Sequence, residues 1–233
     1  MQGHRGILPL REMTRGIVQR IRNPLNALQL NLDSLDDEIA ELKIEDRKEI
    51  PERLRRMRNA VAELDSLLCE FLRLTDLPKP QITIVNVNAL VAEVETFSRP
   101  ESSKKEVMVK VDLQENLPAI QADPVQIKQA ILSVLLNAIE ACLVKGCITL
   151  ATESRGDHIV IKVTDDGEGI PLDHRDHIFE PFFSTKEACV GLGLPLALEI
   201  LKMHQGEMSF TSEVGKGTTF FISLPGRGVV GTK

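Results

Sequence analysis

The sequence of 233 residues contains no tryptophan and no tyrosine, and eight phenylalanines are its only residues among Phe, Trp and Tyr. Proteins that bind single-stranded nucleic acid commonly stack bases on aromatic rings along a basic groove. The formal net charge of −6 also gives no broad basic surface that would attract phosphate backbones or anionic lipid. We therefore do not expect nucleic acid as a partner.

Long apolar segments and paired cysteines are missing as well. No run reaches the length of about 18 apolar residues that a membrane-spanning helix requires. The N-terminal stretch "MQGHRGILPLREM" lacks the apolar core of a signal peptide. We expect no membrane span and a cytoplasmic location. The four cysteines (Cys69, Cys142, Cys147 and Cys189) form no C-x-x-C pair, and we expect them to be reduced.

The first part of the chain, residues 1–77, has the heptad pattern of paired helices. In the first run the apolar positions are Val18, Ile21, Leu25, Leu28, Leu32, Leu35, Ile39 and Leu42, and in the second they are Ile50, Leu54, Met57, Val61, Leu64, Leu68 and Phe71. The charged break "KIEDRKEIPE" separates them. This spacing predicts an antiparallel two-helix hairpin that pairs with a second copy as a four-helix bundle. The alternative is a hairpin that packs on its own C-terminal domain.

The prolines of "TDLPKPQ" mark a linker, and residues 78–233 have a different pattern. The segments "ITIVNV", "EVMVKVDL", "CITLATES" and "HIVIKVTD" are typical of strands. The segments "DPVQIKQAILSVLLNAIEACL" and "GLGLPLALEILKMH" are typical of helices, and Asp123 before Pro124 is a good helix start. "EMSFTSEVGKGTTFFISLP" predicts a closing hairpin. The expected fold of this part is an α/β sandwich, a mixed sheet covered by helices.

Glycine and charge coincide in two places where an element ends or begins. In "VTDDGEGIP" a strand ends at Asp165, and Gly167 and Gly169 would let the backbone approach a flat ligand, although the stretch on its own is also an ordinary tight turn. In "ACVGLGLPLALEI" Gly191 and Gly193 open a helix, where free N–H groups suit a phosphate. A helix start without a ligand has the same pattern.

One polar residue interrupts an apolar helix. Asn137 lies within "SVLLNAIEA". A mid-helix asparagine is unfavourable by propensity and costly if it is buried without a partner, so it calls for a metal ion or a hydrogen-bond network. A core amide satisfied by neighbouring groups is the alternative.

In their order along the chain, "LLNAIEA", "DDGEGIP", "IFEPFFSTK", "GLGL" and "GKGTTF" resemble the N, G1, F and G2 boxes of the GHKL (Bergerat-type) ATPases found in bacterial sensor histidine kinases. The match covers roughly residues 82 to 225. The hairpin with "IRNPLNALQLNLDSL" resembles the dimerisation and phosphoacceptor module of the same proteins. The resemblance implies ATP and Mg²⁺ as cofactors, a homodimer through the hairpin, and the receiver domain of a response regulator as partner.

The resemblance also implies a role for each matching position. Asn137 is expected to hold Mg²⁺ against the triphosphate, and Asp165 to bond the adenine amino group. The remaining expected nucleotide-binding residues are Gly167 and Gly169 beside the base, Lys186, Gly191, Leu192 and Gly193 at the phosphates, and Thr218 on the adenine side. Phe179, Phe182 and Phe183 would brace the lid. Phosphoryl transfer depends mainly on positioning and charge neutralisation, which fits these residue types.

Three positions depart from the pattern near the expected site. Ser133 stands where many members of the family have Asn or His, four residues before the magnesium ligand. Cys189 and Val190 stand where Gly and Thr are usual before the first phosphate-binding glycine. None of these changes removes a principal expected ligand.

The largest departure lies in the hairpin. The motif "H-E-x-x-N-P-L" places the acceptor histidine five residues before the proline, and Pro24 counts back to Gln19, followed by Arg20 in place of the acid. A glutamine amide is neither nucleophilic nor basic at neutral pH, so it cannot accept a phosphoryl group as imidazole does. Asn23 matches the amide that assists phosphatase activity. None of the five histidines occupies the acceptor position.

Three functions are compatible with these observations. The first is a histidine-kinase-like protein of a two-component phosphorelay that binds Mg-ATP and docks a response regulator but does not phosphorylate itself. The second is a pseudokinase, a dimeric binding module that regulates a partner kinase or response regulator. The third is a kinase acting in trans on another protein, which the hairpin disfavours because trans-acting relatives lack it.

Overall fold

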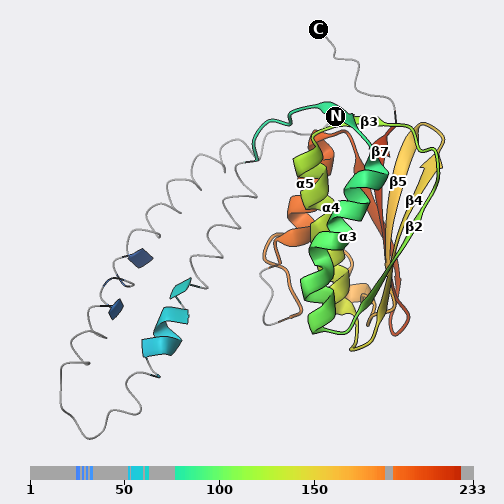
Figure 1. The fold of residues 1–233 in the computed structure, drawn as a ribbon. Coiled ribbons are helices and arrows are strands. Elements are labelled where there is room, and N and C mark those ends of the chain that lie inside the picture. The colour runs from blue at the N-terminus through green and yellow to red at the C-terminus, as the bar shows by residue number, and fades with distance from the viewer. Residues whose placement is uncertain are drawn as a thin grey trace, which may run out of the picture. The chain divides into compact units, whose positions relative to one another are not determined.

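The computed structural model describes residues 77–186 and 191–226, and in the first part of the chain residues 25, 26, 28, 30, 32, 33, 52, 54–59, 61 and 62. The chain divides into two compact units, Met1–Leu77 and Pro78–Lys233. Figure 1 labels the helices and strands of the second unit. Among the described residues, no helix combines the length and apolar character needed to cross a membrane.

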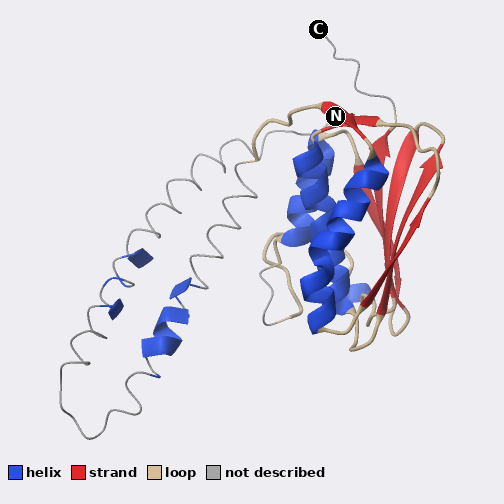
Figure 2. Cartoon of the chain, in the orientation of Figure 1, coloured by secondary structure: helices blue, strands red, loops and turns tan. Residues whose placement is uncertain are grey.

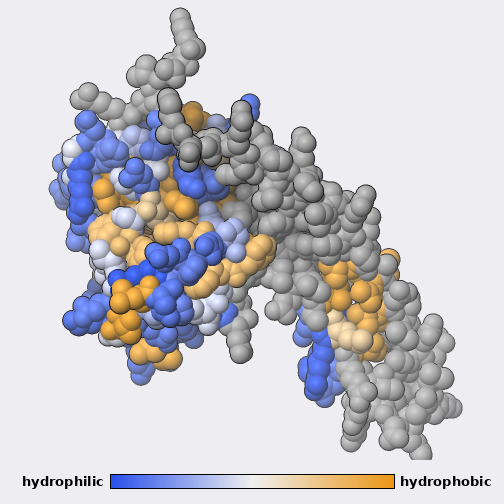
Figure 3. Space-filling model, turned by 180° about the vertical axis from the view of Figure 1, so that it is seen from behind, coloured by the Kyte–Doolittle hydropathy of each residue, from blue (hydrophilic) through white to orange (hydrophobic). Residues whose placement is uncertain are grey.

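The described residues of the first unit before Leu77 are helical. Leu25, Leu32, Leu54 and Val61 form a buried apolar cluster that joins the two heptad runs. Asp33 Oδ1 accepts a hydrogen bond from Arg58 Nε at 3.1 Å across the same two runs. Figure 3 shows hydrophobic and hydrophilic side chains of the described part of this unit gathered in separate areas. These contacts agree with two helices that pair through their apolar stripes.

The second unit is a two-layer α/β structure. Its five-stranded sheet has the order β2-β4-β5-β7-β6 and contains β2 (Met108–Leu113), β4 (Cys147–Arg155), β5 (His158–Asp165), β6 (Glu207–Glu213) and β7 (Gly217–Pro225). Among the described strands of this sheet, β2 and β4 pair in parallel and the other neighbours are antiparallel. The helices α3 (Val87–Lys104), α4 (Pro124–Ala141) and α5 (Gly193–Met203) cover one face (Figure 2). The prediction of an α/β sandwich with a mixed sheet is confirmed for this unit.

Alternation along the strands explains why the helices cover one face only. On β5, Ile159, Ile161 and Val163 are buried, whereas His158 and Thr164 on the opposite face are exposed. The matching inward positions of β7 are Phe220, Ile222 and Leu224, all buried. Successive strand residues point to opposite faces, so this pattern directs one apolar face toward the helices.

Helix α4 lies at the centre of the helical layer and begins at a strong cap. Asp123 Oδ1 accepts from the backbone N–H groups of Val125 and Gln126, and Pro124 occupies the first turn, where no N–H is needed. Asp123 Oδ2 accepts from Gln81 N at 2.7 Å, which ties the segment before α3 to this helix start. The predicted helix start at Asp123 is therefore present.

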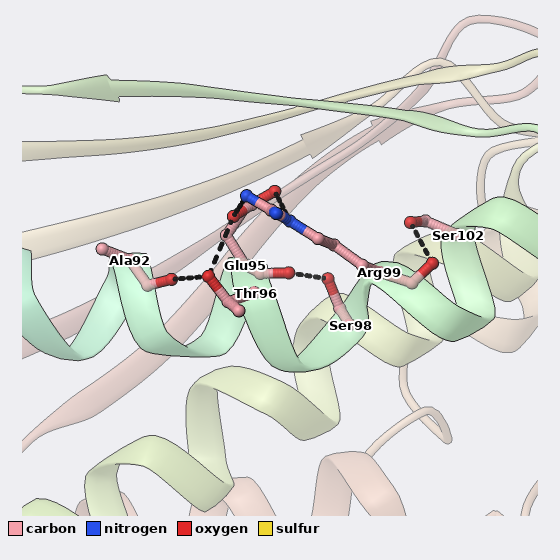
Figure 4. Close-up of polar contacts among 6 residues, drawn as sticks. All are labelled: Ala92, Glu95, Thr96, Ser98, Arg99 and Ser102. Atoms are coloured by element: carbon pink, nitrogen blue, oxygen red, sulfur yellow. Dashed lines mark hydrogen bonds and ion pairs between the residues drawn. The ribbon is translucent and has the colours of Figure 1, made fainter.

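Helix α3 was not predicted from the sequence. It is only weakly amphipathic, and it contains Pro100, which lacks the N–H of a regular helix position. Ser98 and Ser102 are buried, yet their hydroxyls donate to the carbonyls of Glu95 and Arg99 one turn back (Figure 4). Local bonds of this kind let small polar side chains face the interior without an external partner.

Of the two strands in the small second sheet, the sequence predicted β1 but not β3. β1 (Thr83–Val85) pairs antiparallel with β3 (Ile120–Ala122). The segment "ITIVNV" was expected to be a strand throughout, but Asn86 caps α3 by accepting from Ala89 N, and Val87 already belongs to that helix. β3 has three residues, too few for a period-2 pattern to emerge.

Candidate functional site

Asp165 ends β5 with its carboxylate buried, the side chain and backbone together being 3% exposed. Oδ1 accepts from Gly167 N at 2.9 Å and from Thr218 N at 3.1 Å. Oδ2 is buried and has no hydrogen-bond partner. Burial raises the pKa of this carboxyl, and the two N–H groups only partly oppose the rise. An unpaired buried carboxylate oxygen fits a site that awaits a hydrogen-bond donor.

Glycines beside Asp165 allow a close approach of chain segments. A Cβ atom on Gly167 would lie 2.4 Å from the carbonyl oxygen of Ala141, and one on Gly169, where φ is +73°, would lie 2.3 Å from that of Glu213. The turn after β5 is thus held between the end of α4 and the hairpin of β6 and β7. These positions require glycine for the fold as well as for any ligand.

Gly217 was not singled out from the sequence, although it lies at the same place. Its φ is +104°, and a Cβ atom there would lie 2.0 Å from the carbonyl oxygen of Asp165. The motif "GKGT" was the available signal. Thr218 follows it and is 5% exposed, with its hydroxyl 2.9 Å from Ser212 Oγ. Asp165 and Thr218 are direct partners in the β5–β7 register.

Asn137 lies on α4 beside the buried face rather than within it. The buried positions of this helix include Val134, Leu135 and Ala138, whereas Asn137 is half-buried. Within the described part of the chain, its amide makes no hydrogen bond to another polar group, which argues against the alternative of a satisfied core amide. A half-exposed amide without a protein partner fits a ligand group.

The same side of α4 faces the segment that leads to α5. Lys186 Nζ lies 3.8 Å from Glu140 Oε2. The nearest atoms to a Cβ placed on Gly193 belong to Ser133, at 3.9 Å. Of the predicted residues, the structure therefore brings Lys186 and Gly193 to the helix that carries Asn137.

Helix α5 starts at Gly193 with Leu192 as its N-cap, and no side chain caps this end. Gly191 has φ +72°, and a Cβ atom there would lie 2.3 Å from the carbonyl oxygen of Phe183. Phe182 N donates to Gly191 O at 3.1 Å. The uncapped N–H groups of an 11-residue helix are suited to an anion. Cys189 and Val190 lie outside the described residues.

The phenylalanines take three different positions. Phe179 packs edge-to-face on Phe210, with ring centroids 6.0 Å apart. Phe183 lies between His174 and His177, each with its ring centroid 5.6 Å from the phenyl ring. Phe182 is 59% exposed. The expectation that all three brace the lid stays a prediction.

Two other polar groups near Asp165 are structural. Asp166 Oδ1 accepts from Cys147 N at 2.8 Å and lies 3.7 Å from Cys142 Sγ. Burial, together with the charges of Asp165 and Asp166, raises the pKa of the Cys142 thiol to about 12. The thiol is therefore protonated at neutral pH and is no nucleophile. Cys142 and Cys147 are free.

Metal-binding clusters are not evident in the part of the chain that the structure describes: no group of three His, Cys, Asp or Glu side chains converges there. An ion held by one amide and a triphosphate requires no such cluster, because Mg²⁺ commonly takes few protein ligands beside substrate phosphates. Gln19 and Asn23 lie outside the described residues.

Comparison with known proteins gives this geometry a context. Residues 122–228 match the family model of histidine kinase-, DNA gyrase B- and HSP90-like ATPases. The chain is 34% identical over 218 residues to Sporulation kinase C of Bacillus subtilis (strain 168), covering 92% of this chain and 48% of that protein. It is 31% identical over 219 residues to the sensor histidine kinase ZraS of Escherichia coli (strain K12), covering 94% and 46%. The chain spans about half the length of these relatives.

Solved structures agree at the level of the fold. Full-length ShkA in complex with AMPPNP superposes with a TM-score of 0.73 at 23% identity, covering 92% of this chain and 45% of that one. Histidine kinase ThkA in complex with the response regulator TrrA superposes with a TM-score of 0.65 at 24% identity, covering 92% and 61%. Residues 122–228 thus resemble the histidine kinase-, DNA gyrase B- and HSP90-like ATPases in sequence, and most of the chain is similar to sensor and sporulation histidine kinases.

Proposed function

We propose that the second unit binds Mg-ATP and that the chain acts as a histidine-kinase-like component of a two-component phosphorelay, without phosphorylating itself at Gln19. The observation that carries nucleotide binding is the buried, unpaired Oδ2 of Asp165 beside glycines that admit no side chain. A carboxylate can only accept, so it suits the exocyclic amine of adenine and disfavours a carbonyl at the same place.

The rest of the nucleotide would lie along the residues predicted from the sequence. Gly167 and Gly169 would line the base, and the hydroxyl of Thr218 would support its polar edge. Lys186 and the N–H groups at Gly191, Leu192 and Gly193 would meet the phosphates. Among the described residues, the ion-pair partner of the Lys186 ammonium is Glu140 at 3.8 Å, a long contact that phosphate could replace.

Asn137 would supply an amide oxygen to Mg²⁺. The ion would neutralise charge on the triphosphate and orient it, which is the chemistry that phosphoryl transfer needs most. The residues fit this group, because the Asn137 side chain is half-buried on the helix face that Lys186 and Gly193 approach.

The proposed partners are a second copy of the chain and a response-regulator receiver domain. Support for the second copy comes from the first unit, where the seam residues Leu28 and Met57 are 51% and 55% exposed in a single chain. Apolar seam positions of this kind are normally covered by another helix. Support for the receiver comes from ThkA, which is similar in fold and was solved with the response regulator TrrA. A cytoplasmic location is part of the same proposal.

Gln19 also supports an alternative function, that of a pseudokinase. A chain that binds ATP but has no acceptor can serve as a pseudokinase, a dimeric module that regulates a partner kinase or response regulator. Asn23, at the position of the phosphatase-assisting amide, would serve either function. A kinase that acts in trans on another protein is the third and weakest candidate, because kinases of that kind lack the helical hairpin.

Incubation with γ-labelled ATP and Mg²⁺ tests the proposal, with the unaltered chain beside Gln19→His. We expect acid-labile phosphate only on the variant, because imidazole accepts a phosphoryl group and an amide does not. Label on neither protein, with ATP binding intact, favours the pseudokinase. Phosphate on residue 19 of the unaltered chain, or no binding of millimolar Mg-ATP, contradicts the proposal.

A further inference from the structure

Three polar side chains form a row across neighbouring strands at the nucleotide end of the sheet. The β5–β7 register pairs Asp165 with Thr218, and the β6–β7 register pairs Thr218 with Ser212. Paired residues of neighbouring strands project to the same face. The row therefore runs from the Asp165 carboxylate, whose Oδ2 has no partner, to Ser212, a residue that has no role in the proposed function.

The Ser212 hydroxyl lies within hydrogen-bond distance of three groups. It accepts from Ile170 N at 2.7 Å, lies 3.2 Å from Gly217 O, and lies 2.9 Å from Thr218 Oγ1. A carbonyl oxygen can only accept, so the single proton of Ser212 must point to Gly217 O if all three bonds are to form. Thr218 then donates its own proton to Ser212 Oγ.

This assignment settles what the Thr218 hydroxyl can offer a ligand. With its proton committed to Ser212, it presents lone pairs only. Asp165 Oδ2 also presents lone pairs only. Two neighbouring acceptors at one end of the sheet suit a base that carries an exocyclic amine.

Arg175 also contacts both Ser212 and Ile170, through their backbone carbonyl groups. Its Nη2 donates to Ser212 O at 2.5 Å, and its Nε donates to Ile170 O at 3.2 Å. Ile170 is thus held at its N–H by Ser212 and at its carbonyl by Arg175. The guanidinium joins the loop after β5 to the strand β6, and its rigid planar shape suits this double contact.

We propose that Ser212 and Arg175 form a clamp that orients Thr218 as a hydrogen-bond acceptor toward the exocyclic amine of the bound base, directly or through one water. Both are positioning residues, because they act through Thr218 and Ile170 rather than by contact with the nucleotide. The inference rests on the proposed nucleotide site and adds to it the groups that determine preference for a 6-amino over a 6-oxo purine.

Titration calorimetry with the full chain tests the clamp, using Mg-ATP and Mg-ITP, which carries a carbonyl where ATP has the amine. For Ser212→Ala we expect ATP affinity to fall about tenfold, the value of one lost hydrogen bond, and ITP affinity to change much less. Arg175→Ala should act in the same direction. Ser209→Ala is the matched control, because Ser209 lies on the same strand and pairs with Phe221 on the opposite face.

Amide hydrogen exchange of the nucleotide-free proteins provides a second readout. Exchange at Ile170 should accelerate in Ser212→Ala and stay unchanged in Ser209→Ala, because only the first variant removes the acceptor of that N–H.

Three results would overturn the clamp: equal losses for ATP and ITP, which indicate a structural role alone, unchanged ATP affinity in Ser212→Ala, or an equal effect of the control. Failure of the unaltered chain to bind either nucleotide is a different result, because it overturns the proposed function itself. Exchange at Ile170 would still show whether the clamp forms.

Discussion

Asp165 uses one carboxylate oxygen for the fold and leaves the other for the site. Oδ1 holds Gly167 N and Thr218 N, whereas the buried Oδ2 has no partner. The folded-state pKa lies above the usual value, mainly because burial disfavours the charged form. The ionised group therefore destabilises the fold above its folded-state pKa, and this cost shrinks as the pH falls from that pKa to the usual carboxyl pKa. Such a cost is typical of a binding site.

Asp165→Asn should raise the melting temperature of the nucleotide-free protein at neutral pH. The amide oxygen can replace Oδ1, and the neutral side chain removes the buried charge. ATP affinity should fall at least tenfold, about 1.5–3 kcal/mol for a lost charge-assisted bond, because an NH₂ group would then face the amine. Scanning calorimetry and ATP titration measure the two effects. Asp112→Asn, at an exposed position of β2, is the control and should change neither the melting temperature nor the ATP affinity. A lower melting temperature for Asp165→Asn would contradict this account.

At the scale of the element, helix α4 runs from Asp123, which binds the segment before α3 through Gln81, to the turn after Asp165. Its first turn is held by Asp123, which accepts three backbone N–H groups, and its last turn contacts Gly167 in the turn after β5. His204 Nε2 accepts from Asp123 N at 3.1 Å, so the end of α5 supports the same cap. Asn137 lies on this helix, and its position therefore depends on the start of α4.

Removal of the α4 cap should lower stability in a pH-dependent way. Burial alone would raise the pKa of Asp123, but the hydrogen bonds from three backbone N–H groups outweigh it and lower the pKa. The resulting stability is present above the usual carboxyl pKa and is lost as the pH falls through the folded pKa. Asp123→Ala should cost roughly 1–2 kcal/mol of unfolding free energy at neutral pH.

Urea denaturation at a series of pH values measures this effect. The loss in Asp123→Ala should shrink toward acidic pH, because the carboxylate of the unaltered chain is then protonated too. Asp123→Asn is the matched variant: it keeps a cap acceptor and should lose less than Asp123→Ala. An Asp123→Ala loss that is independent of pH would show that the charge does not contribute.

At the scale of the whole molecule, the two units bury their apolar residues in different ways. The second unit covers one sheet face with α3, α4 and α5 and thereby encloses a core of its own. The described part of the first unit buries only alternate seam residues, Leu25 and Leu32 in one run and Leu54 and Val61 in the other. A two-helix hairpin has too few layers to cover a full apolar stripe by itself.

Sedimentation analysis of the full chain should show a dimer that Leu28→Asp and Met57→Asp weaken. A charge at either seam position would be buried without a partner at the proposed interface, which costs several kcal/mol. Leu30→Asp is the control, because Leu30 is 68% exposed and lies off the seam. A monomeric unaltered chain, or equal weakening by all three variants, would contradict the proposed dimer.

The sequence by itself determined the periodic and motif-bearing features. The strands β2, β4 and β5 and the helices α4 and α5 follow from alternation, length and caps, since these signals are local. The turn at Asp165, the helix start at Gly193 and the replacement at Gln19 could likewise be located by motif and spacing. Helix α3 was not predicted, because Pro100 and the buried serines interrupt the apolar pattern of a helix. Strand β3 was not predicted, because three residues are too few to show a strand pattern.

Only the tertiary structure decided how separate segments meet. Ser212 and Arg175 carry no sequence signal, because their partners Ile170, Thr218 and Gly217 are reached through the register of β6 on β7 and the path of the loop after β5. The unpaired Oδ2 of Asp165 is likewise invisible in the sequence, since a missing hydrogen bond is defined by everything packed around the atom. Local pattern specifies which element forms, whereas side-chain contacts between distant residues depend on how those elements pack.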